Sequence, residues 1–236
     1  MKNILLASTS TIYGSDYLEY LLPELEIFLI DVKKILFIPY ARPSGITYDA
    51  YTQIANKALS KIGISVTGIH AYKNPKIAIT QAEAIFVGGG NTFELVNQLY
   101  KNELLLDIEA AVYKGVKYVG TSAGTNICGP TMKTTNDMPI VYPPSFNTLG
   151  LVPFNINPHY LDPDPTSKHK GETRETRIKE FHVYNDTPVI GLREGSWIEV
   201  LGDEMVLKGK LSARLFLKNK KPIEIASQSV INNYLS

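Results

Sequence analysis

Residues 117–126 read Lys-Tyr-Val-Gly-Thr-Ser-Ala-Gly-Thr-Asn, a short apolar run that ends in a serine flanked by glycines. Residues 120–124 form a G-x-S-x-G pattern between an expected strand and a stretch that can form a helix, which is the context of a nucleophile elbow. Such a sharp turn strains its middle residue, so it needs small residues two positions away on each side. The pattern predicts that Ser122 is held above a sheet, with the N–H of Ala123 at a helix N-terminus where negative charge is stabilised. The alternative is a plain glycine-rich turn in which Ser122 is the helix N-cap.

Short apolar runs recur on both sides of this segment and predict the buried strands of a parallel sheet. They lie at residues 4–6, 35–38, 64–69, 85–87 and 118–119. Between them, apolar residues return at helical spacing over 51–62 and 104–112, and Gly63 and Gly115 can end these helices. Strands that alternate with helices imply right-handed crossovers, and hence an α/β fold with a mostly parallel, doubly wound sheet.

The composition of the sequence changes at Pro139, where prolines become frequent. Seven prolines lie between residues 139 and 165, which predicts mostly irregular chain because proline cannot donate to a central ladder. A helix is expected over 174–183, followed by an antiparallel meander that closes the sheet edge, with strands at 189–192, 197–201, 205–207 and 215–217. No linker or repeat is visible, so we expect one domain over residues 1–236.

Composition limits the classes of function. Of the 236 residues, 44% are hydrophobic and 20% charged, which is ordinary globular usage and excludes a disordered chain. The formal net charge of +1 provides no basic field, so we expect neither a nucleic acid nor a membrane as partner. A single cysteine, Cys128, excludes an internal disulfide framework and a multi-cysteine metal site. The apolar run at the start of the chain is too short for a signal peptide or a membrane span, and together these features predict a soluble protein of a reducing compartment.

A second glycine-rich turn follows the expected strand at 85–87, in the sequence Val87-Gly-Gly-Gly-Asn-Thr92. It fits neither nucleotide-binding fingerprint, since Phe93 stands where G-x-G-x-x-G needs glycine and no G-K-[ST] follows. The better interpretation is that a glycine amide here is the second donor of an oxyanion hole whose first donor is Ala123. A tight strand-to-helix turn without a ligand remains the alternative.

A serine nucleophile needs a base, and the chain has four histidines. His159 is favoured, because it follows Pro158 inside the long irregular segment, where the local backbone is pre-set. His169 stands between lysines and is better explained as loop surface or a substrate contact, while His70 and His182 are expected to be structural.

The imidazole must in turn be oriented by an acceptor, usually a carboxylate. Asp137 would give the order serine, aspartate, histidine, whereas Glu194 lies at the carboxyl end of an expected strand, where sites gather in open α/β sheets. Order along the chain does not choose between them. Cys128 lies inside the segment after Ser122 and is expected to be a buried, inert thiol.

Taken together, these segments resemble the peptidase E family of serine peptidases, the α-aspartyl dipeptidases. The matching stretches run in order over most of the chain, at residues 87–93, 120–124, 134–140, 156–159, 171–175 and 191–195. The resemblance implies a fold similar to class I glutamine amidotransferases (flavodoxin-like) and cytoplasmic cleavage of dipeptides with an N-terminal aspartate. It also implies that no metal or cofactor is needed.

Matched by position, Ser122 is the nucleophile, His159 the general base, and Gly90 and Ala123 supply the oxyanion-hole amides. Asp137 and Glu194 both match positions proposed for the third member, and Glu194 is favoured as the direct partner of the histidine. Donors for the substrate carboxylate are expected in the polar stretch that holds Arg174, Arg177, Lys170 and His169. A cyanophycinase-like hydrolase of other aspartyl substrates, an amidotransferase-type glutaminase and a non-enzymatic flavodoxin-like anion-binding module are the competing interpretations.

Overall fold

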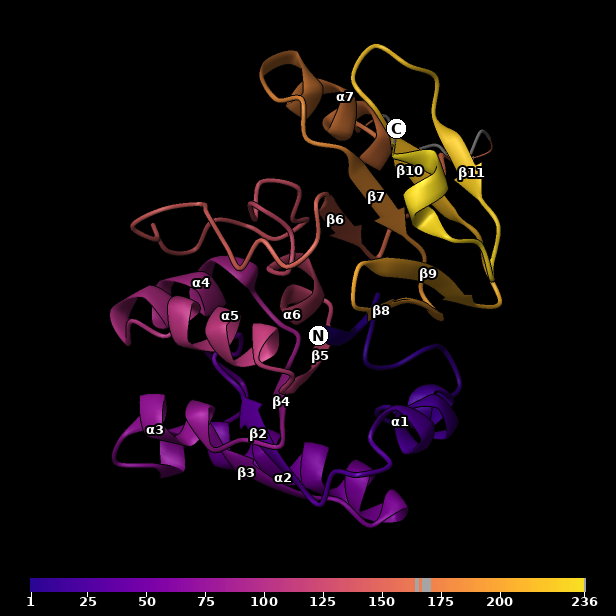
Figure 1. Ribbon diagram of the computed structural model, residues 1–236. Helices are drawn as coiled ribbons and strands as arrows, with labels where there is room; N and C mark the ends of the chain where they lie inside the picture. The colour runs from indigo at the N-terminus through magenta and orange to yellow at the C-terminus, as the bar shows by residue number, and fades with distance from the viewer. Residues whose placement is uncertain (164–165, 167–170, 236) are drawn as a thin grey trace.

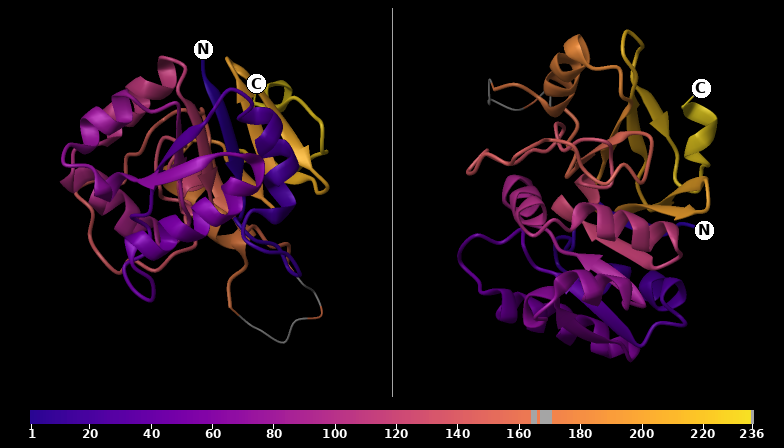
Figure 2. Two further views of the ribbon diagram at one scale, coloured as in Figure 1. Left: turned by 90° about the horizontal axis from the view of Figure 1, so that it is seen from below. Right: turned by 60° about the vertical axis from the view of Figure 1, so that its left-hand side comes forward.

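The computed structural model describes residues 1–163, 166 and 171–235. Two β-sheets organise the chain. In Figure 1 the smaller sheet stands above the larger one with helix α7 beside it, and the right-hand view of Figure 2 shows the same two tiers.

The larger sheet has seven strands in the order β3-β2-β4-β5-β1-β8-β9. The first five in that order run parallel, and β8 and β9 add an antiparallel hairpin next to β1. The parallel strands are β1 (Asn3–Ala7), β2 (Lys34–Ile38), β3 (Ser65–Gly68), β4 (Ala84–Val87) and β5 (Lys117–Thr121). The hairpin is formed by β8 (Ser196–Leu201) and β9 (Glu204–Gly209).

Helices cover both faces of this sheet because successive residues of each central strand are buried and point to opposite faces. Leu5 and Ala7 of β1 pack into one cluster with α1 (Leu22–Phe28) and α2 (Tyr48–Leu59). Ile4 and Leu6 pack on the opposite face with α3 (Pro75–Thr80), α4 (Thr92–Lys101), α5 (Leu105–Tyr113) and α6 (Ala123–Asn126). The prediction of a mostly parallel, doubly wound α/β sheet is therefore confirmed. Short 3₁₀ helices lie at Glu19–Leu21, Ser60–Ile62, Ile69–Ala71 and Ile231–Tyr234.

The smaller sheet corrects the sequence-based expectation for the second half of the chain. Its order is β11-β10-β7-β6, from β6 (Asn155–Pro158), β7 (Val189–Leu192), β10 (Ala213–Phe216) and β11 (Ile223–Ile225). Strand β6 lies inside the segment expected to be irregular; proline is tolerated there because β6 is an edge strand and Pro158 is its last residue. Strands β8 and β9 close the edge of the larger sheet, whereas β7, β10 and β11 pair within the smaller sheet. The sequence of a short apolar strand does not specify which strand it will pair with.

Apolar packing joins the two sheets. One cluster of buried residues includes Leu6 of β1 together with Ile156 of β6, Ile190 of β7 and Leu215 of β10. One domain over residues 1–236 stays a prediction. Helix α7 (Arg174–Tyr184) packs on the other side of the smaller sheet through Ile178. Within the described part of the chain, no helix is long and apolar enough to cross a membrane.

Candidate active site

The G-x-S-x-G segment forms a tight turn between β5 and α6. Ser122 has φ 52° and ψ −110°, a conformation that costs a non-glycine residue of order 1–3 kcal/mol. A Cβ atom at Gly120 would lie 2.6 Å from the carbonyl oxygen of Gly124, and one at Gly124 would overlap the carbonyl of Val87. Glycine is needed at both positions because backbones, not side chains, press against the turn. The Ser122 side chain makes no N-cap hydrogen bond, so the N-cap interpretation of this turn is wrong.

The hydroxyl of Ser122 instead faces His159. Its Oγ lies 2.8 Å from Nε2 of the imidazole, and Nδ1 of the same ring lies 2.6 Å from Oε1 of Glu194. A carboxylate only accepts, so Nδ1–H donates to Glu194, which leaves Nε2 as the acceptor for the hydroxyl proton of Ser122. A serine, a histidine and a glutamate thus form one continuous hydrogen-bonded chain.

Ser8 holds His159 in place, and sequence reasoning missed it. His159 follows β6 with φ 54°, and its backbone N–H donates to Oγ of Ser8 at 2.9 Å. The fully buried Ser8 hydroxyl donates in turn to the carbonyl of Leu192, at the end of β7, at 2.8 Å. One small hydroxyl therefore ties β1 to both strands that lead to the histidine and the glutamate. The available signal was the change from apolar to polar residues directly after β1.

Asp137, the other carboxylate candidate, lies apart from the hydrogen-bonded chain. Its Oδ2 accepts from the backbone N–H of Thr92 at 2.7 Å, from the Thr92 hydroxyl at 2.6 Å and from the Thr135 hydroxyl at 3.0 Å. It thus caps the N-terminus of α4, where the helix dipole stabilises a negative charge. The structure brings Glu194, and not Asp137, to the histidine.

The glycine turn after β4 lies beside the serine. Gly90 has φ 143°, and a Cβ atom there would overlap the carbonyl of Ala41; one at Gly89 would come within 2.9 Å of Ser122 Cβ. Among the described residues, the N–H groups of Gly90 and Ala123 have no backbone or side-chain acceptor. Two free amides next to one serine are what an oxyanion hole requires.

These groups open into a cleft of about 620 Å³ over the carboxyl ends of β1, β2, β4 and β5. Its walls include one arginine, Arg42, which sequence reasoning missed although it lies just after an expected strand. The cleft is lined by Thr9, Ser10, Thr11, Ala41, Arg42, Pro43, Ser44, Gly89, Gly90, Asn91, Ser122, Asp137 and His159.

Of the cations expected to bind the substrate, those that the structure describes do not line the cleft. Arg174 is half-buried at the start of α7 and is not among the lining residues; burial and nearby Arg177 lower its pKa, and the charge of Asp137 opposes this. Arg177 is exposed and lies 4.0 Å from Glu172. Lys170 and His169 lie outside the described residues.

The remaining candidates are structural, as expected. His70 contacts Asp49 at 2.8 Å, and His182 contacts the carbonyl of Thr187 at 3.1 Å. Cys128 is fully buried, and burial raises the pKa of its thiol well above the ordinary value.

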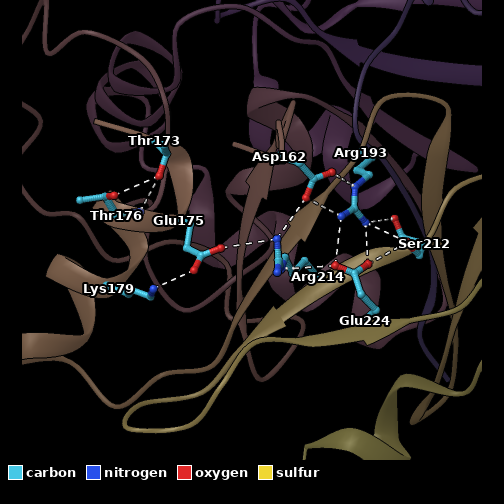
Figure 3. A network of polar contacts seen from close by, with 9 residues as sticks. All are labelled: Asp162, Thr173, Glu175, Thr176, Lys179, Arg193, Ser212, Arg214 and Glu224. Atoms are coloured by element: carbon cyan, nitrogen blue, oxygen red, sulfur yellow. Dashed lines mark hydrogen bonds and ion pairs between the residues drawn. The ribbon is translucent and has the colours of Figure 1, made fainter. Parts of the chain in front are cut away.

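A cluster of charges (Figure 3) links the two segments that carry His159 and Glu194. Arg193, directly before Glu194, donates two hydrogen bonds to Asp162, three residues after His159, both at 2.8 Å. The same guanidinium donates to Glu224 of β11 at 2.9 Å and to the backbone of Ser212 at 2.8 Å. The side chain of Arg193 is only 14% exposed, whereas its partners Asp162 and Glu224 are about half exposed, so the cluster lies at the protein surface with its cation covered.

Arg214 of β10 extends this cluster toward α7. It lies 3.2 Å from Asp162 and 3.4 Å from Glu175, the residue after Arg174. Figure 3 shows the line of contacts from Glu224 to Glu175. The start of α7 is thereby fixed to the same cluster.

The comparisons of this chain with known proteins agree on one family. A sequence model described as Peptidase family S51 matches residues 4–208. The chain is 51% identical over 233 residues to "Peptidase E" of Streptomyces coelicolor, covering 99% of this chain and 95% of that protein. It is 47% identical to "Probable alpha-aspartyl dipeptidase" of Drosophila melanogaster, over 95% of this chain and 94% of that one.

Solved structures support the fold. A peptidase from an acI-B1 actinobacterium superposes with a TM-score of 0.72 at 18% identity, over 98% of this chain and 96% of that one. A Listeria monocytogenes structure named for peptidase E gives 0.68 at 23% identity, over 89% and 98%.

Substituting Gly124→Ala should disrupt the turn, because its methyl group has no space beside Val87. We expect a loss of about 3 kcal/mol in the free energy of unfolding and at least a tenfold loss of activity. Gly63→Ala is the control: a Cβ atom there has nothing within 4 Å, so only the cost of its positive φ, about 1 kcal/mol, and full activity are expected. Denaturant unfolding and a peptidase assay measure both; equal behaviour of the two variants would contradict the proposed constraint.

Substituting Arg193→Met should leave Asp162 and Glu224 with Arg214 as the cation that they still share, and lower the free energy of unfolding by about 2 kcal/mol. Hydrogen bonds from Arg193 lower the pKa of Asp162, so the pair stabilises the fold above about pH 4 and is lost as the pH falls through that lowered pKa. The difference from the unsubstituted protein should therefore shrink in acid. Lys218→Met, which breaks an exposed pair with Asp186, is the control, with a loss under about 1 kcal/mol. Urea titrations at neutral and acidic pH measure the free energy of unfolding of both variants. An equal loss in the two variants would contradict the role given to Arg193.

Proposed function

The chain belongs to peptidase family S51 and is a serine peptidase, and from this premise we propose that it hydrolyses dipeptides with an N-terminal aspartate through an acyl-enzyme on Ser122. The observation that carries the proposal is the chain of 2.8 Å and 2.6 Å contacts from Ser122 through His159 to Glu194 on the wall of an open cleft. Small peptides are the substrate class.

The proposed reaction is acyl transfer. His159 takes the proton of Ser122 at Nε2 as Oγ attacks the peptide carbonyl, and Glu194 stabilises the imidazolium through Nδ1. The N–H groups of Gly90 and Ala123 donate to the oxyanion, each worth about 3 kcal/mol in the transition state. The imidazolium then protonates the leaving amine, and a water activated by the same histidine hydrolyses the aspartyl ester.

Specificity for aspartate is proposed from the name of the Drosophila relative and from the charges near Asp137. Asp137 lines the cleft; its Oδ2 accepts three hydrogen bonds, whereas Oδ1 accepts none among the described residues. We assign Oδ1 to the N-terminal ammonium of the substrate. Arg174, whose charge is coupled to Asp137, then provides the partner for the aspartyl carboxylate.

Membership of a peptidase family favours this function over the non-enzymatic anion-binding module. A serine in the elbow, rather than a cysteine, argues against the glutaminase. The cyanophycinase-like alternative differs in the linkage cleaved, and α- and β-aspartyl peptides separate the two. We also propose a cytoplasmic location, because a lone buried thiol fits a reducing compartment.

Replacing Ser122 with Ala should remove the nucleophile without disturbing the fold. We expect kcat for Asp-Leu to fall by at least about 10⁴-fold, with unchanged thermal unfolding. The unsubstituted protein should prefer Asp-Leu to Glu-Leu and to the β-aspartyl isomer. Full activity of the variant would refute the nucleophile, and a preference for the β-linked peptide would refute the substrate.

Glu194→Gln and Asp137→Asn should have different kinetic effects. The first removes the charge that stabilises the imidazolium, so kcat should fall by about 10²- to 10⁴-fold. The second removes the charge assigned to the substrate ammonium, so KM should rise by about tenfold with little change in kcat. Asp186→Asn, on an exposed pair with Lys218, serves as the control. A larger loss of kcat in Asp137→Asn would reverse the two assignments.

A further inference from the structure

Arg42 is a cation in the cleft without a carboxylate partner. It is the one lysine or arginine among the residues that line the described cleft, and no ion pair joins it to any described carboxylate. Arg193 and Arg214, by contrast, are both held in ion pairs. A guanidinium left open toward a substrate cleft is available to bind an anion.

The position of Arg42 is set by an aromatic platform. Its guanidinium carbon lies 5.2 Å from the ring centre of Tyr51, a buried residue of α2. The hydroxyl of Tyr51 donates to the carbonyl of Gly89 at 3.1 Å, inside the turn that carries the proposed oxyanion hole. The carbonyl of Ala41, directly before Arg42, accepts from the N–H of Asn91 at 2.7 Å, just after the same turn. Both contacts fix the cation relative to the site of attack.

Arg42 and Asp137 lie at opposite walls of the cleft. Arg42 rests on α2, which covers one face of the larger sheet, whereas Asp137 is bonded to Thr92 at the start of α4, which covers the other face. Ser122 follows β5 of the sheet that separates these two faces, and it lines the same cleft. A dipeptide has the same polarity, with an ammonium at one end, a carboxylate at the other and the scissile carbonyl between them.

We propose that Arg42 binds the C-terminal carboxylate of the dipeptide, and so the leaving residue. The inference rests on the proposed function and deepens it. A guanidinium recognises a carboxylate with two parallel hydrogen bonds, which a neutral peptide or amide group cannot reproduce. The same contact explains a preference for dipeptides, because a longer substrate places an uncharged peptide group at Arg42.

The test compares Asp-Leu with Asp-Leu-amide in the unsubstituted protein and in Arg42→Gln. We expect the unsubstituted protein to lose about 10- to 100-fold in kcat/KM on going from acid to amide. Arg42→Gln should lose the same factor on Asp-Leu and less than about twofold on the amide. Arg42→Lys should recover part of the loss, and Lys57→Gln, an exposed cation of α2 outside the cleft, should change neither.

Binding provides a readout that does not depend on turnover. In the Ser122→Ala background, calorimetric titration should show the acid binding more tightly than the amide only while Arg42 is present. An equal loss on both peptides would overturn the inference. So would a loss that disappears with Asn-Leu, since Arg42 would then bind the aspartyl side chain. If the unsubstituted protein cleaves neither peptide, the proposed function itself fails, which is a separate result.

Discussion

The turn at Ser122 exists because two backbones approach it with no side chain between them. Gly120 presses on the carbonyl of Gly124, and Gly124 presses on the carbonyl of Val87 in the neighbouring strand. This contact holds Ser122 at a positive φ and keeps its hydroxyl off the helix, where it would otherwise act as a cap. The strain is balanced by surrounding packing, since the turn stands on the fully buried strands β4 and β5.

The rest of the hydrogen-bonded chain comes from the smaller sheet. His159 follows β6 and Glu194 follows β7, so their distance from Ser122 depends on how the two sheets pack against each other. Shared apolar packing brings the two sheets together, and the hydrogen bonds of the buried Ser8 hydroxyl position His159 and Leu192 relative to β1. The charged cluster around Arg193 then holds the two segments to each other on their outer side. The hydrogen-bonded chain from Ser122 to Glu194 requires accurate distances between its side chains. Two separate sets of polar contacts, those of the Ser8 hydroxyl and those of the Arg193 cluster, maintain these distances.

Charge is distributed along the cleft as the proposed substrate would require. Asp137 stands on one wall, Arg42 on the other, and the two amides of the oxyanion hole lie between them. The chemistry is thus carried by side chains at the carboxyl ends of the strands, where an open α/β sheet leaves room for them.

The amino-acid sequence by itself determined the parallel sheet, its two helical layers and the position of the elbow, because these follow from local periodicity and from glycine spacing between adjacent residues. It also singled out His159 and the pair Asp137 and Glu194; chain order did not choose within that pair, and the family resemblance favoured Glu194. Tertiary structure alone decided which carboxylate meets the imidazole, that β6 is a strand, and that Ser8 and Arg42 belong to the site. Each of these depends on pairing between segments more than thirty residues apart, such as β6 with β7. The local sequence pattern does not show which distant segments come into contact, because a polar residue after a strand can face either solvent or another segment of the chain.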